Sequence, residues 1–211
     1  MDWNDLIAQR HNAFAWQERE VNINLIKESM QQVFNFAPSK NQKYPFIIKL
    51  IKNNQIRKKQ LMTICHRNLD LDVENDRGNP QVLAPYLIGF CERNVSELEK
   101  TKEDYRDNDD IVNYSCLEMG LQAAYLMLAL ANKGLDTGIC SCIQDQIQAG
   151  ELFGLPNKCK LILGIGYSKG TGSFDYLDPR TNKTKQIPYA RTNKDTVYPK
   201  PSLDKIYQWE I

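Results

Sequence analysis

Residues 113–133 read NYSCLEMGLQAAYLMLALANK, the longest apolar segment in a chain of 211 residues. Polar side chains fall at its start, whereas almost every residue from Leu121 to Ala131 is apolar. Alanine, leucine and methionine are strong helix formers, so the segment predicts one long helix. A helix that is apolar on nearly every side lacks a solvent face, which places it inside a core or at a subunit interface. Gly134 is expected to end this helix, with Lys133 in its last turn.

The composition restricts the class of protein. The chain has 27 Lys and Arg against 26 Asp and Glu, a formal net charge of +1. Proteins that bind nucleic acid usually carry a marked basic excess, so we expect no nucleic-acid partner. The apolar run of the long helix covers about eleven residues, fewer than the ~20 that a membrane span needs. The first residues, MDWNDLIAQRH, contain no apolar run behind a basic start. We therefore expect a cytoplasmic globular protein with no membrane segment.

Six cysteines stand at positions 65, 91, 116, 140, 142 and 159. They lack the paired CxxC spacing of a zinc site, and Cys140 and Cys142 form only a CxC. We therefore expect reduced, mostly buried thiols and no metal site. A redox role for Cys140 and Cys142 is the alternative, and we favour buried structural thiols because the spacing is tighter than that of redox CxxC pairs.

Shorter elements surround the long helix. Helices are predicted at residues 3–10, 22–35, 54–67 and 143–153, and strands at 44–51, 86–91, 138–140 and 161–167. The last strand is apolar on both faces, which predicts a central position in its sheet. Phe34 and Ile147 are expected to face inward from their helices. The chain from Ser168 onward is polar and rich in turn residues. We find no repeat and no linker, so residues 1–211 are predicted to form one α+β domain with a polar C-terminal extension from about 168.

Three short segments group hydrogen-bonding side chains or glycines on this apolar scaffold. Arg10-His11-Asn12 lies near a helix end, Pro38-Ser39-Lys40-Asn41 forms a turn, and Gly164-Ile165-Gly166-Tyr167 ends a strand. An arginine fork suits a phosphate, and Ser or Asn can bind the edge of a heteroaromatic ring. Glycines at a strand end let a ligand approach the backbone. Each segment alone also fits an ordinary surface or turn, so their chemistry by itself identifies no ligand.

The order and spacing of these segments are more specific than any one of them. Arg10-His11-Asn12 is followed by Phe14 and Trp16, and the turn belongs to the run APSKNQKYPF at 37–46. Further along lie GLDTG at 134–138, LP at 155–156 before LILGIGY at 161–167, and YPKPSLD at 198–204. In this order, over roughly residues 3–205, they resemble the signatures of the nitroreductase family of FMN-dependent enzymes.

The resemblance implies a nitroreductase-like α+β fold. A central, mostly antiparallel sheet would be flanked by helices, and the long helix would be buried in the core of a homodimer with FMN at the interface. The residues that the resemblance assigns to the cofactor are Arg10, His11, Asn12, Phe14, Pro38, Ser39, Lys40, Asn41, Thr137, Gly138, Ile165, Gly166 and Lys200. Arg10 and Lys200 would hold the FMN phosphate. Pro38, Ser39 and Asn41 would come from the partner subunit.

The activity implied by the resemblance is hydride transfer from NADH or NADPH through FMN to a small electron-poor acceptor, such as a nitroaromatic, a quinone or a flavin, in a ping-pong cycle. The flavin carries the chemistry, so no catalytic side chain is expected. Phe14 stands where the family often has Arg or Lys, and Arg57 and Lys58 are candidates for a basic residue that often follows the first strand. Phe14 and the altered region after Asn41, where the family has QPW, motivate one alternative: a flavin-binding protein without turnover, for storage or sensing. The polar segments 68–80 and 94–112 could form a lid, which motivates another: a specialised flavin enzyme such as a dehalogenase.

Overall fold

A computed structural model describes residues 2–10, 12–39, 44–66, 78–93, 108–170, 173–178, 182–188 and 190–191. Its helices are α1 (Trp3–Gln9), α2 (Ile23–Phe36), α3 (Gln55–Ile64), α4 (Asn108–Asn132) and α5 (Gln146–Leu152), with a short 3₁₀ helix, η2 (Pro80–Leu83). Its strands are β1 (Asn12–Ala13), β2 (Phe46–Lys52), β3 (Tyr86–Glu92), β4 (Asp136–Cys140), β5 (Cys159–Gly166), β6 (Ser173–Asp178), β7 (Lys183–Pro188) and β8 (Ala190–Arg191).

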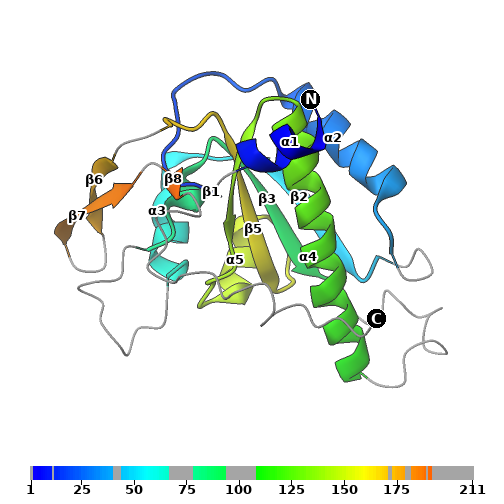
Figure 1. The fold of residues 1–211 in the computed structure, drawn as a ribbon. Coiled ribbons are helices and arrows are strands. Elements are labelled where there is room, and N and C mark those ends of the chain that lie inside the picture. The colour runs from blue at the N-terminus through cyan, green and yellow to red at the C-terminus, as the bar shows by residue number, and fades with distance from the viewer. Residues whose placement is uncertain are drawn as a thin grey trace, which may run out of the picture.

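Six strands form one mixed sheet in the order β2-β3-β5-β4-β1-β8 (Figure 1). Only the β1–β4 pair is parallel among these; the others are antiparallel. The predicted mostly antiparallel sheet is therefore confirmed, and so is the inner position of β5 between β3 and β4. Strands β6 and β7 pair with each other in a separate two-stranded sheet.

Side chains of β3 divide between two hydrophobic clusters. Ile88 and Phe90 pack with residues of α2 and α4, whereas Leu87 and Cys91 pack with residues of α3 and α5. Since successive side chains of a strand point to opposite faces, the two clusters cover the two faces of the sheet. The result is a sheet between two helical layers, and both layers bury apolar surface against it.

The long helix is confirmed, and α4 ends before Gly134, which has a φ of 75°. One side of α4 packs against α2 and the sheet. The other side is not buried by the residues that the structure describes, since Leu117 is 68% exposed, Tyr125 43% and Leu121 36%. A helix that is apolar all round can bury only one side against a sheet. The chain on its own therefore leaves an apolar stripe, which we call the α4 stripe, consisting of Leu117, Leu121 and Tyr125.

Within α4, the segment Asn113–Asn132 is long and apolar enough for a membrane span by length and composition. Its window has a mean hydropathy of 1.2, and 44% of that window is buried within the chain. Core helices of globular proteins have the same character, and α4 contacts α1, α2 and three strands of the sheet.

The sequence did not predict four of the strands. β1 and β8 have two residues each, too few for any periodicity. β6 and β7 lie in the tail that composition described only as polar. The predicted inward direction of Ile147 is also wrong, since this side chain, in the first turn of α5, is 44% exposed. The organisation of the whole chain as one domain stays a prediction.

Candidate functional site

Three of the expected cofactor residues meet where β1 joins β4, which we call the β1–β4 junction. Asn12 pairs in register with Thr137, and its Oδ1 accepts a hydrogen bond from the backbone N of Ile139 at 2.9 Å. Gly138 is required here, because a Cβ at this position would collide with the carbonyl oxygen of Ala13. The glycine thus allows β1 to lie close to β4. The hydrogen bond from Ile139 leaves Nδ2 as the polar group with which Asn12 could contact a ligand.

Arg10 lies beside the same junction. It caps the C-terminus of α1 and lines a hollow of about 120 Å³ together with Gly134, Asp136 and Thr137. Asp136 is the acidic residue of this lining, and its Oδ2 accepts a hydrogen bond from the backbone N of Ser168 at 2.7 Å. A guanidinium at such a hollow can bind a phosphate by charge-assisted hydrogen bonds.

A larger cleft of about 470 Å³ is lined by the segment that follows β1 and by residues of β2, α3 and β3. We call it the basic cleft because its lining includes Arg19, Lys52, Lys58 and Lys169, against the carboxylates Glu18 and Glu20. Phe14, Trp16 and Tyr86 supply aromatic surface. The cleft therefore combines a flat apolar surface with a positive charge excess, which suits an anionic aromatic ligand.

Two of the basic side chains have distinctive surroundings. Burial lowers the pKa of Lys58 from its ordinary value, and the charge of Glu18 partly opposes this shift. The guanidinium carbon of Arg19 lies 3.9 Å from the ring centroid of Tyr167, a cation–π contact. Lys58 is thus the cation of this cleft whose charge is least well solvated, and an anionic ligand would favour its protonated form.

Several buried polar atoms lack a partner among the described residues, and one of them, on Gln81, lies at the junction. Trp16 Nε1, Asn79 Nδ2 and Gln81 Oε1 have no hydrogen-bond partner in the part of the chain that the structure describes. The Nε2 of Gln81 donates to the carbonyl of Ile139 at 3.1 Å, and its Cβ and Cγ lie against Gly138. An unpaired buried group costs about 1–3 kcal/mol, so a ligand that supplies the missing partner gains affinity.

Sequence reasoning missed Asn79 and Gln81. The polar segment 68–80 contains Asn79, and neither Asn79 nor Gln81 was assigned a role, although Gln81 is only 4% exposed. The available signal was the position of two amides directly before a strand of apolar residues, since amides next to a buried strand need partners.

Ile165 and Gly166 lie inside the sheet. Ile165 pairs with Tyr86 on one side and Thr137 on the other, and its side chain is fully buried. A Cβ on Gly166 would lie 2.9 Å from carbon atoms of Pro85 and Trp16. The structure thus gives each residue a packing role, and ligand contact by either one stays a prediction.

Pro38 and Ser39 belong to a different region of the chain. Ser39 Oγ donates to Glu118 Oε2 at 2.7 Å and accepts from the backbone N of Tyr44 at 3.2 Å. From Glu118 to the end of α4 at Asn132, close to the Gly134 that lines the Arg10 hollow, the helix rises about 21 Å at 1.5 Å per residue. Within one chain Ser39 is therefore remote from Arg10, as residues supplied by a partner subunit would be. The expected site residues His11, Lys40, Asn41 and Lys200 lie outside the described residues.

Arg57 does not line the basic cleft. Its Nε donates to the carbonyl of Leu152 and its Nη1 to the carbonyl of Lys52, both at 2.9 Å. The guanidinium therefore joins α3 to the end of α5 and the end of β2. Of the two basic candidates after the first strand, Lys58 lies at the cleft and Arg57 holds helices and sheet together.

We expect Arg57→Ala to lower the free energy of unfolding by about 2 kcal/mol, because two carbonyls lose a charged donor. Binding of any ligand in the basic cleft should stay unchanged, since the side chain is occupied by backbone carbonyls. Urea unfolding measures the first effect, with Lys59→Ala at an exposed position of the same helix as the control. An Arg57→Ala protein as stable as the control would show that the two hydrogen bonds contribute nothing.

The prediction of mostly buried thiols is confirmed: all six cysteines are free, and four of them are buried. A hydrogen bond with the thiol of Cys140, together with burial, raises the pKa of Cys65. A hydrogen bond with Cys91, together with burial, raises the pKa of Cys159. Raised values keep these two thiols protonated and poorly nucleophilic. In the described part of the chain, no group of His, Cys, Asp and Glu is arranged to hold a metal ion.

No protein-family model and no curated protein matches this sequence. Solved structures are similar to it in fold. A nitroreductase family protein from Clostridium difficile 630 is 18% identical with a TM-score of 0.62, over 100% of this chain and 99% of that one. The NADPH:FMN oxidoreductase from Vibrio harveyi, complexed with NAD+, is 14% identical with a TM-score of 0.63, over 96% and 80%. A nitroreductase from Lactococcus lactis in complex with 4-nitrophenol is 15% identical with a TM-score of 0.59, over 85% and 97%.

Proposed function

Because this chain has the nitroreductase fold, we propose that it is a cytoplasmic FMN-dependent oxidoreductase that takes hydride from NADH or NADPH and delivers it to a small electron-poor acceptor. Similar structures include an NADPH:FMN oxidoreductase solved with NAD+ and a nitroreductase solved with 4-nitrophenol. The observation that carries the proposal is the β1–β4 junction, where Arg10 lines a small hollow and the buried Oε1 of Gln81, beside Gly138, has no hydrogen-bond partner among the described residues.

The residues at the junction fit FMN. Arg10 would hold the phosphate. The unpaired Nδ2 donor of Asn79 and Oε1 acceptor of Gln81 match the carbonyl oxygens and the N–H on the pyrimidine edge of a flavin. Bound FMN would accept hydride from the nicotinamide and pass reducing equivalents to the acceptor. The protein would bind and orient the flavin, and none of its side chains is required as an acid or a base.

Phe14 brings no charge to the position where the family often has a cation. Phe14 and Lys58 line the same cleft, and Phe14 is only 5% exposed. We therefore infer that Lys58, from a different element, supplies the positive charge near the flavin ring. A cation there favours the reduced, more negative flavin. A cation supplied by Lys58, in place of the one that Phe14 lacks, favours turnover over the alternative of a storage or sensing protein.

The proposed site is shared between two copies of the chain. The α4 stripe is an exposed apolar surface on a helix that is otherwise in the core. A second copy placed there would bury Leu117, Leu121 and Tyr125, and would bring its own Ser39 toward the first copy. A homodimer with FMN between the subunits satisfies both observations.

The proposal is tested by the visible absorption spectrum of the purified protein after FMN is added and free flavin is removed. We expect a flavin spectrum that bleaches without oxygen when NADH or NADPH is added, and recovers with 4-nitrophenol or a quinone. Bound flavin that neither nucleotide bleaches would support the storage or sensing alternative. Bleaching without recovery would favour a specialised flavin enzyme, and failure to take up FMN would refute the proposal.

Arg10→Ala should weaken FMN binding about 10- to 100-fold, because a hydrogen bond to a charged group contributes roughly 1.5–3 kcal/mol. Arg10→Lys should retain part of the affinity, since it keeps the charge but loses the fork. Quenching of FMN fluorescence measures both, with Lys59→Ala as the control for loss of a surface charge. If Arg10→Ala and the control bind FMN with equal affinity, the FMN phosphate does not bind in this hollow.

A further inference from the structure

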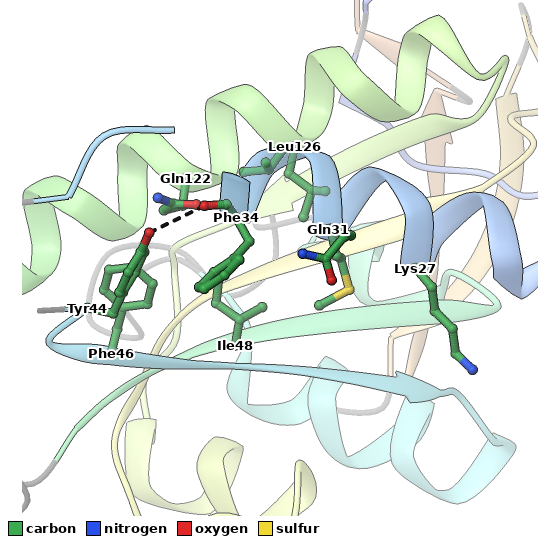
Figure 2. Close-up of a pocket in the computed structure, with 10 residues that line it drawn as sticks. Lys27, Gln31, Phe34, Tyr44, Phe46, Ile48, Gln122 and Leu126 are labelled. Carbon is green, nitrogen blue, oxygen red and sulfur yellow. Dashed lines mark hydrogen bonds between the residues drawn. The ribbon is translucent and has the colours of Figure 1, made fainter. Parts of the chain in front are cut away.

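We propose that the groove between α2, α4 and the start of β2 binds a planar aromatic compound that carries a neutral carbonyl oxygen. The groove encloses about 410 Å³ (Figure 2). Its walls are a ridge of α2 with Lys27, Gln31 and Phe34, the β2 residues Phe46 and Ile48, and Gln122 of α4. We call it the α2–α4 pocket. None of these residues belongs to the proposed flavin site, so the inference does not depend on the proposed function.

Three aromatic rings give the pocket a flat apolar wall. Phe34 and Tyr44 stack with centroids 5.3 Å apart, and Phe46 meets Tyr44 edge-on at 6.0 Å. The hydroxyl of Tyr44 donates to the carbonyl of Phe34 at 3.3 Å, and Tyr44 adopts a φ of 46°. A non-glycine residue in this left-handed region is strained, so the rings are held in place against a local preference. Phe34 is nevertheless 58% exposed, although the sequence predicts it to face inward.

Gln122 is the polar group that gives the pocket specificity. It is only 2% exposed, and its Nε2 has no hydrogen-bond partner among the described residues. A buried amide donor without a partner destabilises the free protein, and apolar residues of similar length would avoid that penalty. The donor is available to an oxygen atom that enters with a ligand.

The lining also limits the class of ligand. Small-molecule sites of roughly 300–1,000 Å³ are mostly apolar with a few placed polar groups, as here. A carboxylate beside Gln122 would be buried without a cation, so a neutral carbonyl is the better acceptor. Lys27 lies toward the opposite end of the row of side chains in Figure 2 and is exposed, so an acidic group is favoured there. An aromatic ketone with a carboxylate at its far end meets each condition.

The pocket adjoins the α4 stripe. Gln122 lies about 140° around the helix from Leu117 and about 100° from Leu121, but only about 60° from Tyr125, at ~100° per residue. A second copy that covers Leu117 can leave Gln122 facing α2, with Tyr125 between the pocket and the proposed subunit contact.

Two probes of the same shape test the proposal: 9-fluorenone-2-carboxylate, which has a ring carbonyl, and fluorene-2-carboxylate, which has none. Calorimetry on the protein as purified, without added FMN or nicotinamide nucleotide, should show about tenfold tighter binding of the ketone, the contribution of one hydrogen bond. Gln122→Met should abolish that difference by weakening only the ketone. Lys27→Met should weaken both probes alike.

Gln122→Met should also raise the melting temperature by about 2–4 °C, because it removes a buried donor that has no partner. Gln60→Met, at an exposed position of α3, is the matched control and should change neither binding nor melting. If Gln122→Met has a higher melting temperature and no longer prefers the ketone, Gln122 is a ligand-binding residue rather than a structural one.

Four outcomes would overturn the proposal. They are no binding of either probe at about 1 mM, equal affinities for the two probes, displacement of the ketone by added FMN, and a Gln122→Met protein that keeps its preference for the ketone. A change in sedimentation of Gln122→Met would likewise contradict it, since a second copy of the chain would then cover the pocket.

Discussion

Replacing Gly164 with alanine is expected to lower the free energy of unfolding by about 3 kcal/mol, a large part of the ~5–15 kcal/mol that stabilises a typical domain. A Cβ at this position would collide with the carbonyl oxygen of Gln81 and lie 2.9 Å from the Cβ of Ala84. Gly164 is in the middle of β5, which pairs with β3 and β4, so the strand cannot move away. The backbone of η2 would have to move instead.

The measurement is urea unfolding of Gly164→Ala beside Gly120→Ala. Gly120 lies within α4 with nothing within 4 Å of a Cβ placed on it. Alanine there should raise stability by about 0.5–1 kcal/mol, since glycine is the poorer helix residue. If Gly164→Ala lowers the free energy of unfolding and Gly120→Ala raises it, the space around the new Cβ, and not the loss of a glycine, decides the result. A Gly164→Ala protein as stable as the parent would mean that η2 does not lie against β5 in this way.

Replacing Leu117 with glutamate should convert the proposed dimer into a monomer. Leu117 is 68% exposed on the α4 stripe, and a two-fold interface buries it once in each subunit. Loss of two buried leucines and burial of two carboxylates should raise the dissociation constant of the dimer about 100-fold or more. Because the flavin site is proposed to need both copies, FMN should be lost with the dimer.

Sedimentation velocity and FMN content measure this effect, with Ile56→Glu as the control. Ile56 is 71% exposed on α3, away from the stripe, and carries the same change of an apolar side chain to a carboxylate. We expect the control to remain dimeric and flavin-bound. A Leu117→Glu protein that stays dimeric would show that the interface lies elsewhere. A monomer that keeps its FMN would show that one chain alone forms the whole flavin site.

The helices and inner strands could be predicted because their signals are long. α4 follows from a run of strong helix formers, and β5 from apolar residues on both of its faces. β1 could not be predicted, since it has only two residues. It forms because Asn12 pairs with Thr137 and because Gly138 leaves room for the carbonyl oxygen of Ala13. Short strands of this kind are defined by tertiary contacts and leave no periodic pattern.

The candidate site was predictable in part. Arg10 and Asn12 have side chains suited to a ligand, and a motif could identify them. Gly164 instead leaves room for η2, and Gly166 leaves room for the side chains of Pro85 and Trp16. From a sequence alone, a glycine that serves such packing cannot be distinguished from one that leaves room for a ligand. Asn79 and Gln81 become candidates only when burial and missing partners are known, and neither quantity can be read from a single sequence.

The pairing of β1 also has a kinetic consequence. Asn12 is held between Thr137 and Arg191, which are both distant in the chain, whereas β2 pairs with β3 across a shorter span. Closing long loops is entropically expensive, so contacts of large sequence separation form late unless something compensates. The strand that carries Asn12 should therefore join the sheet after β2, β3 and β5 have associated. The nascent protein would bring Asn12 into place last, when most of its core is already closed.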